Sequence, residues 1–261
     1  MPEISYKNVP VHYVVQGKGR AVVLLHGFLE NLSMWKELSE ELSKKYKMVS
    51  IDLFGHGGTG NLGYIHTMEE QAKMVKAVLD ELNLRRYVLI GHSMGGYIAL
   101  AMAEAYPENI KGLCLLNSTA LEDSDEKKLN RDRAVEAVKS HTETFVKMAI
   151  PNLFSEDNRT KFLPEIQAIT KEALRSSKQG IIAAIEGMKI RKNRVHLLKS
   201  EQYPIFMIMS KKDPALVFDS LVEQTKNTPV LTAILPDGHM SHIENKEEVT
   251  EILVQFVKKC Y

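Results

Sequence analysis

Hydrophobic positions along the chain follow two different periods. The run Ala21–Leu25 is wholly apolar, which is typical of a strand buried on both faces. Similar strand-like runs are found at 11–15, 47–53, 87–90 and 110–116. Helical spacing separates them at 34–45, from Thr67 to about Leu82, and from Met94 to Ala105. Strands that alternate with helices predict an α/β fold with a mostly parallel central sheet and helices on both faces.

The periodicity changes after residue 116. Residues 121–200 contain no strand-like run but fit amphipathic helices at about 125–139, 142–150, 158–176 and 179–190. Strand-like runs then return at 204–209 and 230–235, and 247–259 reads as a closing helix. We therefore predict a core of residues 1–118 and 201–261, interrupted by a helical lid insertion at 119–200.

The composition excludes several classes of protein. With 34 Lys+Arg against 33 Asp+Glu, the net charge of +1 argues against nucleic acid or an anionic membrane as a partner. The longest apolar runs have about five residues, whereas a membrane-spanning helix needs roughly 20. Residues 1–5 show no secretory signal, and two cysteines make no disulfide framework. These features predict a cytoplasmic protein without a membrane span.

The segment Gly91-His92-Ser93-Met94-Gly95 matches the nucleophile elbow, in which a serine stands on a tight strand-to-helix turn. Glycines two residues before and after the serine remove the side chains that would collide in that turn. The strand-like run before the motif and the helical pattern after it supply the required context. Ser93 is therefore the predicted nucleophile.

A serine nucleophile needs a base, and the base needs an acid that orients it. His239 and Asp213 each follow a predicted strand, where side chains meet at the carboxyl edge of a parallel sheet. Gly238 lets the chain turn sharply before His239, which favours this base over His242. The rival acids are Asp219, Asp237 and Asp123. Asp219 lies too far beyond its strand, Asp237 would point away from a base two residues on, and Asp123 lies in the polar start of the insertion.

The segment His26-Gly27-Phe28 follows the first buried strand. The oxyanion that forms during acyl transfer needs two fixed donors, and the backbone amides of Phe28 and Met94 are the candidates. Gly27 would let the backbone approach the substrate, and His26 would brace the loop.

Other motifs are given structural interpretations. The glycine-rich loop 52–60 lacks the Lys-Ser/Thr of a P-loop, so Asp52 and His56 are expected to hydrogen-bond locally. No metal-ligand spacing is found, and no cofactor is predicted. The basic residues from Lys189 to Arg194 are interpreted as a solvated helix face.

Taken together, His26-Gly27-Phe28, loop 52–60, Gly91 to Gly96, Asp213 and Gly238-His239 resemble the α/β-hydrolase superfamily over the whole chain. Within it, the chain looks like the serine esterase and lipase branch with a helical lid. The resemblance implies a carboxylesterase that forms an acyl-enzyme on small-molecule esters of short to medium acyl length. Related members are C–C hydrolases, thioesterases, cofactor-free haloperoxidase-like enzymes, a lyase and ligand-binding receptors, and these alternatives stay open.

Overall fold

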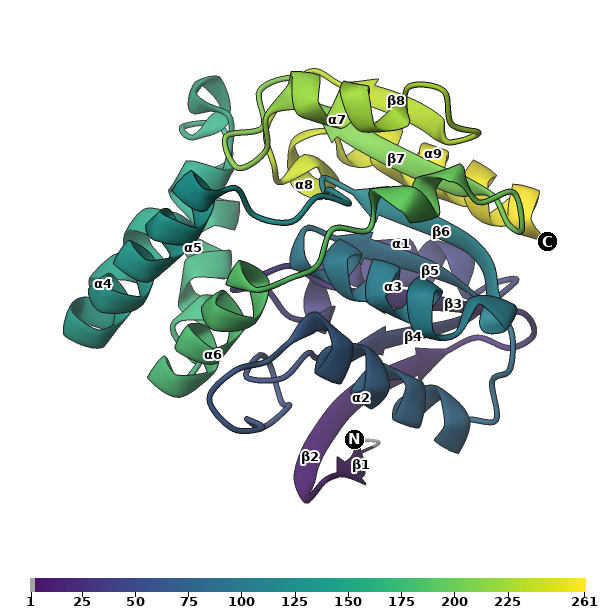
Figure 1. Ribbon diagram of the computed structural model, residues 1–261, viewed down its shortest axis with the longest axis horizontal. Helices are drawn as coiled ribbons and strands as arrows, with labels where there is room; N and C mark the ends of the chain where they lie inside the picture. Colours follow the sequence, from purple (N-terminus) through teal and green to yellow (C-terminus); the bar gives the residue numbers. More distant parts are fainter. Residues whose placement is uncertain (1–2) are drawn as a thin grey trace.

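The protein forms one eight-stranded sheet with helices on both faces (Figure 1). The computed structural model describes residues 3–261, so the first two residues of the segment searched for a secretory signal lie outside it. The strand order is β1-β2-β4-β3-β5-β6-β7-β8. The strands are β1 (Glu3–Tyr6), β2 (Val9–Gln16), β3 (Ala21–Leu25), β4 (Lys47–Ile51), β5 (Tyr87–His92), β6 (Ile110–Leu116), β7 (Ile205–Ser210) and β8 (Leu231–Leu235). Strands β3 to β8 run parallel to one another, whereas β1 pairs antiparallel with β2 and β2 pairs antiparallel with β4, so the predicted fold class is confirmed.

The first strand was not predicted from the sequence. It pairs with β2 through a tight turn at Lys7 and Asn8, whose φ angles are 50° and 65°. Both central residues of this hairpin turn therefore lie in the left-handed region, which glycine or Asn-Gly usually occupies. Because the turn carries Lys-Asn instead, the usual hairpin signal is missing.

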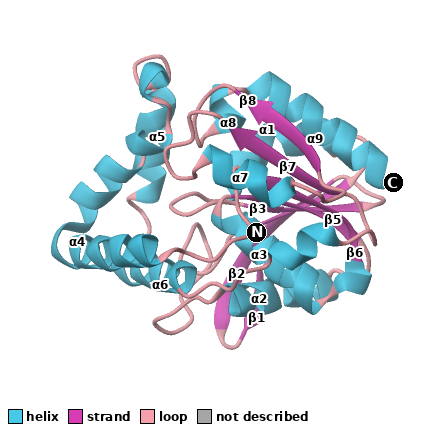
Figure 2. Cartoon of the chain, turned by 45° about the horizontal axis from the view of Figure 1, so that its top comes forward, coloured by secondary structure: helices cyan, strands magenta, loops and turns pink. Residues whose placement is uncertain are grey.

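Helices cover both faces of the sheet (Figure 2). Alternate residues of the buried strands point to opposite faces, so that Val23 belongs to one hydrophobic cluster and its neighbour Leu24 to the other. The first cluster packs against α2 (Met68–Glu81) and α3 (Met94–Ala105). The second packs against α1 (Lys36–Leu42) and the closing helix α9 (Lys246–Cys260).

The segment between β6 and β7 is helical, as predicted. It contains α4 (Asp125–Ala149), α5 (Leu163–Ala173) and α6 (Lys178–Lys189), which lie beside the sheet in Figure 1. The two helices predicted at 125–139 and 142–150 are both present within α4, where the non-helical conformation of His141 (φ −145°, ψ 69°) separates them. Short 3-10 turns connect α4 to α5. We call residues 119–200 the insertion.

One ion pair joins the two ends of the insertion and another ties its second end to α3, and these contacts overturn one expectation. Arg191 and Arg194 are buried, with 4% and 2% of their surface exposed, so they do not lie on a solvated face. Arg191 Nη1 lies 2.5 Å from Asp123 Oδ1, and Arg194 Nη2 lies 2.9 Å from Glu104 Oε2. The interpretation was wrong because these acidic partners are about 70 and 90 residues away in the sequence.

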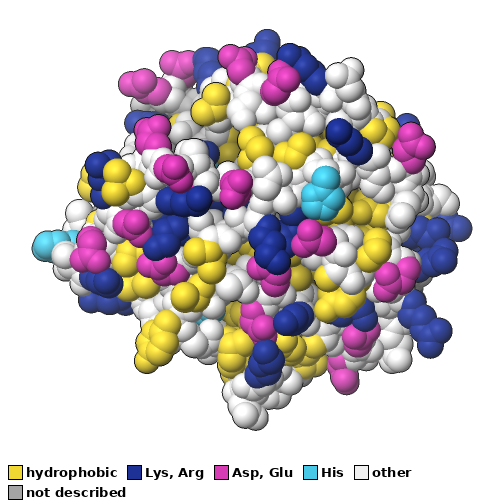
Figure 3. Space-filling view, viewed as in Figure 1, with side chains coloured by type: hydrophobic (Ala, Val, Ile, Leu, Met, Phe, Trp, Pro, Cys, Tyr) yellow, Lys and Arg dark blue, Asp and Glu magenta, His cyan; other side chains and the backbone are white. Residues whose placement is uncertain are grey.

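The surface carries interspersed charges. On the face shown in Figure 3, basic and acidic side chains alternate without a large patch of one sign. Among residues 3–261, no helix combines the length and the apolar character needed to cross a membrane.

Candidate active site

The predicted nucleophile lies on a strained turn between β5 and α3. Ser93 has φ 50° and ψ −114°, a conformation that a residue with a side chain rarely adopts. A Cβ atom at Gly91 would lie 2.4 Å from the carbonyl oxygen of Gly95, and one at Gly95 would lie 2.2 Å from the carbonyl oxygen of Leu25. These close approaches explain why the motif needs glycine at both positions.

The structure brings His239 and Asp213 together. Nδ1 of His239 lies 2.8 Å from Oδ2 of Asp213, and both side chains are buried. The backbone amides of Ala215 and Leu216 donate to the other carboxylate oxygen at 2.8 and 3.0 Å. Burial alone would raise the pKa of Asp213, but His239, the side chain of Asn117 and the amide of Ala215 outweigh it and lower that pKa. An ionised Asp213 only accepts hydrogen bonds, so Nδ1 of His239 carries the proton and Nε2 remains free to act as a base.

The rival acids do not reach His239. Asp123 is paired with Arg191 and Arg131 at the start of the insertion. Asp237 accepts a hydrogen bond from Asn245 at 2.8 Å. Asp219 lies in the first turn of α7 (Phe218–Thr225), beyond the strand end.

The rival base has a different environment. His242 belongs to the short helix α8 (Ser241–Glu244), and its Nε2 lies 3.6 Å from Oε1 of Glu30. Burial lowers the pKa of His242 to about 4, so its ring is neutral near pH 7 and this contact is not an ion pair.

Both backbone groups of His239 are hydrogen-bonded to other parts of the chain. Its N–H donates to the carbonyl oxygen of Leu153 in the insertion at 2.9 Å. Its carbonyl oxygen lies 3.0 Å from Nε2 of His92. A Cβ atom at Gly238 would lie 2.3 Å from the backbone nitrogen of Ser155, so glycine is required there by the close approach of the insertion. Gly238 has no positive φ, so the sharp turn expected there is not the reason for the glycine.

The two predicted oxyanion donors come from the start of a helix and from a loop. Met94 is the first residue of α3, and the N–H groups of a helix's first turn have no partner within the helix. Phe28 lies in the loop that follows β3. A Cβ atom at Gly27 would lie 2.4 Å from Oε2 of Glu30 and 2.8 Å from Nδ1 of His92, so Gly27 makes room for these two side chains.

The loops around the site are braced as expected. Asp52 accepts hydrogen bonds from the amides of Leu32 and Gly58 at 2.8 Å each. Nε2 of His26 accepts from the amide of Leu53 at 2.9 Å, and its Nδ1 lies 2.7 Å from the carbonyl oxygen of Gly27. Burial lowers the pKa of both His26 and His56, the latter to about 3, so both rings are neutral structural elements.

Sequence reasoning missed a buried cluster of Glu30, His92 and His242. Their nitrogen and oxygen atoms lie within 4.8 Å of one another, which makes this the one group within residues 3–261 with the composition and spacing of a metal site. However, Oε2 of Glu30 and both ring nitrogens of His92 already make hydrogen bonds of 2.7 to 3.0 Å within the protein. A metal ion would have to displace these bonds. The signals in the sequence were the histidine before Ser93 and the glutamate three residues after Gly27.

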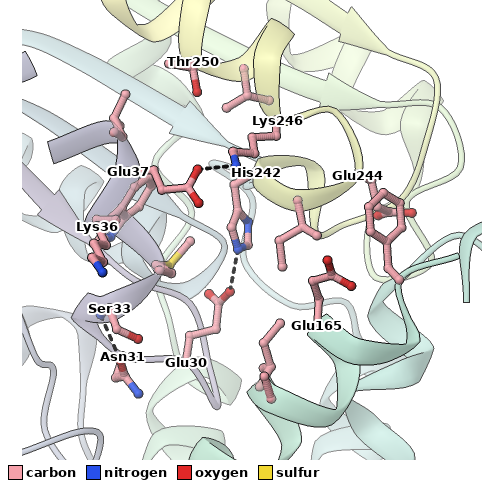
Figure 4. Close-up of a pocket in the computed structure, with 18 of the residues that line it drawn as sticks. Glu30, Asn31, Ser33, Lys36, Glu37, Glu165, His242, Glu244, Lys246 and Thr250 are labelled. Atoms are coloured by element: carbon pink, nitrogen blue, oxygen red, sulfur yellow. Dashed lines mark hydrogen bonds and ion pairs between the residues drawn. The ribbon is translucent and has the colours of Figure 1, made fainter. Parts of the chain in front are cut away.

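A cavity of about 700 Å³ opens on the outer side of this cluster (Figure 4). The side chains of Glu30 and His242 point toward each other in this view, while Glu165 comes from α5 and Lys246 from α9. Neither Ser93 nor His239 lines this cavity, so it is separate from the predicted nucleophile and base.

Comparison with known proteins assigns the family. The family described as the alpha/beta hydrolase fold matches residues 20–160, more than half of the chain. The chain belongs to this family.

Relatives and solved structures agree with this assignment. A thermophilic esterase from Thermogutta terrifontis, solved with malate bound, has 28% identity, a TM-score of 0.92, and coverage of 99% of this chain and 98% of its own. A putative 2-succinyl-6-hydroxy-2,4-cyclohexadiene-1-carboxylate synthase from Bacillus subtilis is 26% identical over 95% of both chains. The acetyltransferase component of the acetoin cleaving system from Pseudomonas putida is 28% identical over 92% of this chain, which spans 64% of that relative's length.

Proposed function

We propose that the protein is a carboxylesterase that acts on short to medium acyl esters through Ser93, His239 and Asp213. The hydrogen bond of 2.8 Å between His239 Nδ1 and Asp213 Oδ2 carries this proposal, because it makes Nε2 the nitrogen of the neutral His239 ring that can accept a proton. The ring of His239 lies 5.1 Å from the ring of His92, the residue before Ser93. The likeness to the Thermogutta terrifontis esterase, at 28% identity over nearly the whole of both chains, supports ester hydrolysis.

The mechanism is acyl transfer in two steps. His239 takes the proton of Ser93 as its Oγ attacks the ester carbonyl, and the amides of Phe28 and Met94 bind the resulting oxyanion. His239 then protonates the leaving alcohol, which leaves an acyl group on Ser93. In the second step His239 activates water, which releases the acid and restores the serine. Asp213 holds the His239 tautomer throughout and stabilises its cation.

The insertion serves in this proposal as the lid of the acyl pocket. The insertion contacts the predicted catalytic base directly, because the backbone N–H of His239 donates to the carbonyl oxygen of Leu153. A second contact is made by Glu244, whose Oε1 accepts hydrogen bonds of 2.9 Å from the amide and hydroxyl of Ser155. A roof anchored in this way closes over the acyl chain, which favours short to medium chains.

The test is turnover of p-nitrophenyl esters with acyl chains of two to twelve carbons, together with labelling by a fluorophosphonate. We expect hydrolysis of the shorter esters and a single label on Ser93, located by peptide mass spectrometry. Labelling at another residue, or hydrolysis that continues after Ser93 is fully labelled, would contradict the assignment.

A lyase acting on a carbon–carbon or carbon–oxygen bond is the second candidate, favoured by the end-to-end similarity to the Bacillus subtilis synthase. Such a reaction uses the same base but passes through no acyl-enzyme. Rapid mixing with p-nitrophenyl acetate distinguishes the two. An esterase gives a burst of p-nitrophenol equal to the enzyme concentration when deacylation is slow, or steady turnover when it is fast. A lyase gives neither.

A further inference from the structure

A chain of buried hydrogen bonds connects three loops that carry the predicted catalytic groups. Oε2 of Glu30 accepts from the backbone amide of Gly27 at 2.7 Å, next to the predicted oxyanion donor Phe28. The same oxygen lies 2.7 Å from Nδ1 of His92, the residue before Ser93. Nε2 of His92 then lies 3.0 Å from the backbone oxygen of His239.

The protonation states of this chain follow from its contacts. A carboxylate on one side and a carbonyl oxygen on the other are both acceptors, so both ring nitrogens of His92 must donate. His92 is therefore an imidazolium ion that pairs with the carboxylate of Glu30. Both side chains are buried, with 1% of His92 and 4% of Glu30 exposed. Such charge-assisted hydrogen bonds are short and directional, and they hold their partners in fixed geometry.

We propose that Glu30 and His92 are positioning residues, which set the distance between the oxyanion loop, the nucleophile elbow and the base. This inference rests on the proposed function, since it assigns the pair a role in the same reaction. Neither side chain acts on the substrate. His92 fixes the backbone of His239 from the core side, and Glu30 fixes both His92 and the backbone of Gly27.

A role in folding alone would not require this arrangement. The pair could be buried anywhere in the core, yet it touches one backbone atom in each of the two loops that flank Ser93. A Cβ atom at Gly27 would collide with both side chains, so the backbone of the oxyanion loop lies directly against the pair. The rings of His92 and His239 also lie 5.1 Å apart, so charge on one affects protonation of the other.

The electrostatic surroundings of His92 allow a test by pH. The titratable side chains around it are Glu30, His26, Asp213, His239 and His242. Replacing His92 by Gln leaves the Glu30 anion unbalanced, which favours the protonated form of His239. Replacing Glu30 by Gln removes that anion and leaves any cation on His92 unbalanced, which disfavours the protonated form of His239. The two variants should therefore shift the pKa of His239 in opposite directions.

The experiment compares wild type, Glu30→Gln and His92→Gln, with Asp123→Asn as the control. Like Glu30, Asp123 is a buried carboxylate that pairs with a buried cation. Unlike Glu30, it lies at the start of the insertion, where it pairs with Arg131 and Arg191. Each rate is divided by the number of sites that a fluorophosphonate labels, so that misfolded protein does not count. We expect kcat per labelled site to fall about tenfold to a hundredfold in both test variants, the scale of a misplaced catalytic group, with KM changing less than about threefold. Asp123→Asn should lower Tm and leave kcat per labelled site unchanged.

A second readout needs no substrate. The downfield proton resonance of His239 Nδ1, bonded to Asp213, reports the pKa of His239 when it is followed by NMR through a pH series. We expect its midpoint to rise in His92→Gln and to fall in Glu30→Gln, while Asp123→Asn behaves like the wild type. Wild-type midpoints in both test variants would overturn the positioning role, whether or not esters are hydrolysed. Wild-type protein that takes no fluorophosphonate label and hydrolyses no ester would overturn the proposed function instead.

Discussion

The carboxyl edge of the sheet and the insertion are held in place by different kinds of contact. At the sheet edge, Ser93, Asp213 and His239 are held by backbone geometry, by a strained turn and by amides at 2.8 to 3.0 Å. In the insertion, position depends on side chains that reach across long sequence distances, such as Arg191 to Asp123. In the proposed function, the sheet edge places the chemistry and the insertion shapes what reaches it.

Loss of the nucleophile should have the largest effect. In Ser93→Ala, we expect ester turnover to fall by about three to six orders of magnitude, because only the oxyanion donors and substrate binding remain. The measurement is kcat/KM for p-nitrophenyl acetate, with circular dichroism to show that the fold is kept. Turnover within tenfold of wild type would remove Ser93 from the mechanism.

The two histidines three residues apart should differ sharply. His239→Ala should lose nearly as much activity as Ser93→Ala, because nucleophile and base act as one unit. His242→Ala should keep turnover within about tenfold of wild type, since His242 contacts Glu30 at 3.6 Å and not Asp213. Kinetics of the two variants on the same ester give the ranking, and the reverse order would identify His242 as the base.

Removing the insertion should change selectivity more than chemistry. A Gly/Ser linker in place of 126–187 keeps the Asp123–Arg191 pair that joins the two ends. In the intact protein, each buried CH₂ of the acyl chain is worth about 0.8 kcal/mol, or about fourfold in kcat/KM over the first few carbons. We expect this dependence to flatten in the linker variant. Labelling of Ser93 in both forms is the control for folding, and an identical profile would place selectivity in the core loops.

Acid should weaken the core through Glu30. Burial would raise the pKa of Glu30, but the charge and hydrogen bond of His92 outweigh it and lower that pKa from 4.5 to about 2. The stability that this carboxylate contributes is therefore present above pH 4.5 and lost as pH falls toward 2, on the order of 3 kcal/mol in total. Urea unfolding at several pH values should show a shallower loss in Glu30→Gln. The control is Glu248→Gln, an exposed position of α9, which should follow the wild type.

Chelation should have the smallest effect. Because the hydrogen bonds of Glu30 and His92 already occupy the one cluster with metal-like composition in the described chain, we expect EDTA to leave the rate unchanged. Initial rates before and after dialysis against the chelator are the measurement. A loss that a divalent ion restores would direct attention to Glu30, His92 and His242.

Local sequence patterns predicted the core well, because each strand and helix there follows from its own residues. Ala21–Leu25, Met94–Ala105 and Ile110–Leu116 have the predicted bounds. The helix predicted from Thr67 also forms, and the hydroxyl of Thr67 caps it by accepting from the amide of Glu70 at 3.1 Å. The carboxylate of Glu70 accepts from the hydroxyl of Tyr6 in β1, a strand that the sequence did not reveal.

Long-range pairing of polar side chains could not be predicted from one sequence. Arg191 was interpreted as solvated because nothing near it in the chain suggests Asp123, 68 residues away. Glu30 and His92 are 62 residues apart, and each taken alone is an ordinary polar residue in a loop. Only the folded structure shows that Glu30 and the carbonyl oxygen of His239 both lie within hydrogen-bond distance of the His92 ring. For the candidate site, the sequence therefore indicated the groups proposed to react, and the structure was needed to find those that hold them.

The closed base of the insertion has a consequence for how such a protein can change. The amide of Arg194 donates to the carbonyl oxygen of Ala120 at 2.7 Å, and Asp123 and Arg191 pair beside it, so the chain leaves and rejoins the core at one point. A segment whose ends already meet can be lengthened, shortened or exchanged at little entropic cost to the rest of the fold. The residues from Ala120 to Arg194 can thus be exchanged as one unit. Under the proposed lid role, a helical segment from another hydrolase, grafted between Asp123 and Arg191, would change the substrate range while β6, β7 and the loops around Ser93 keep their register.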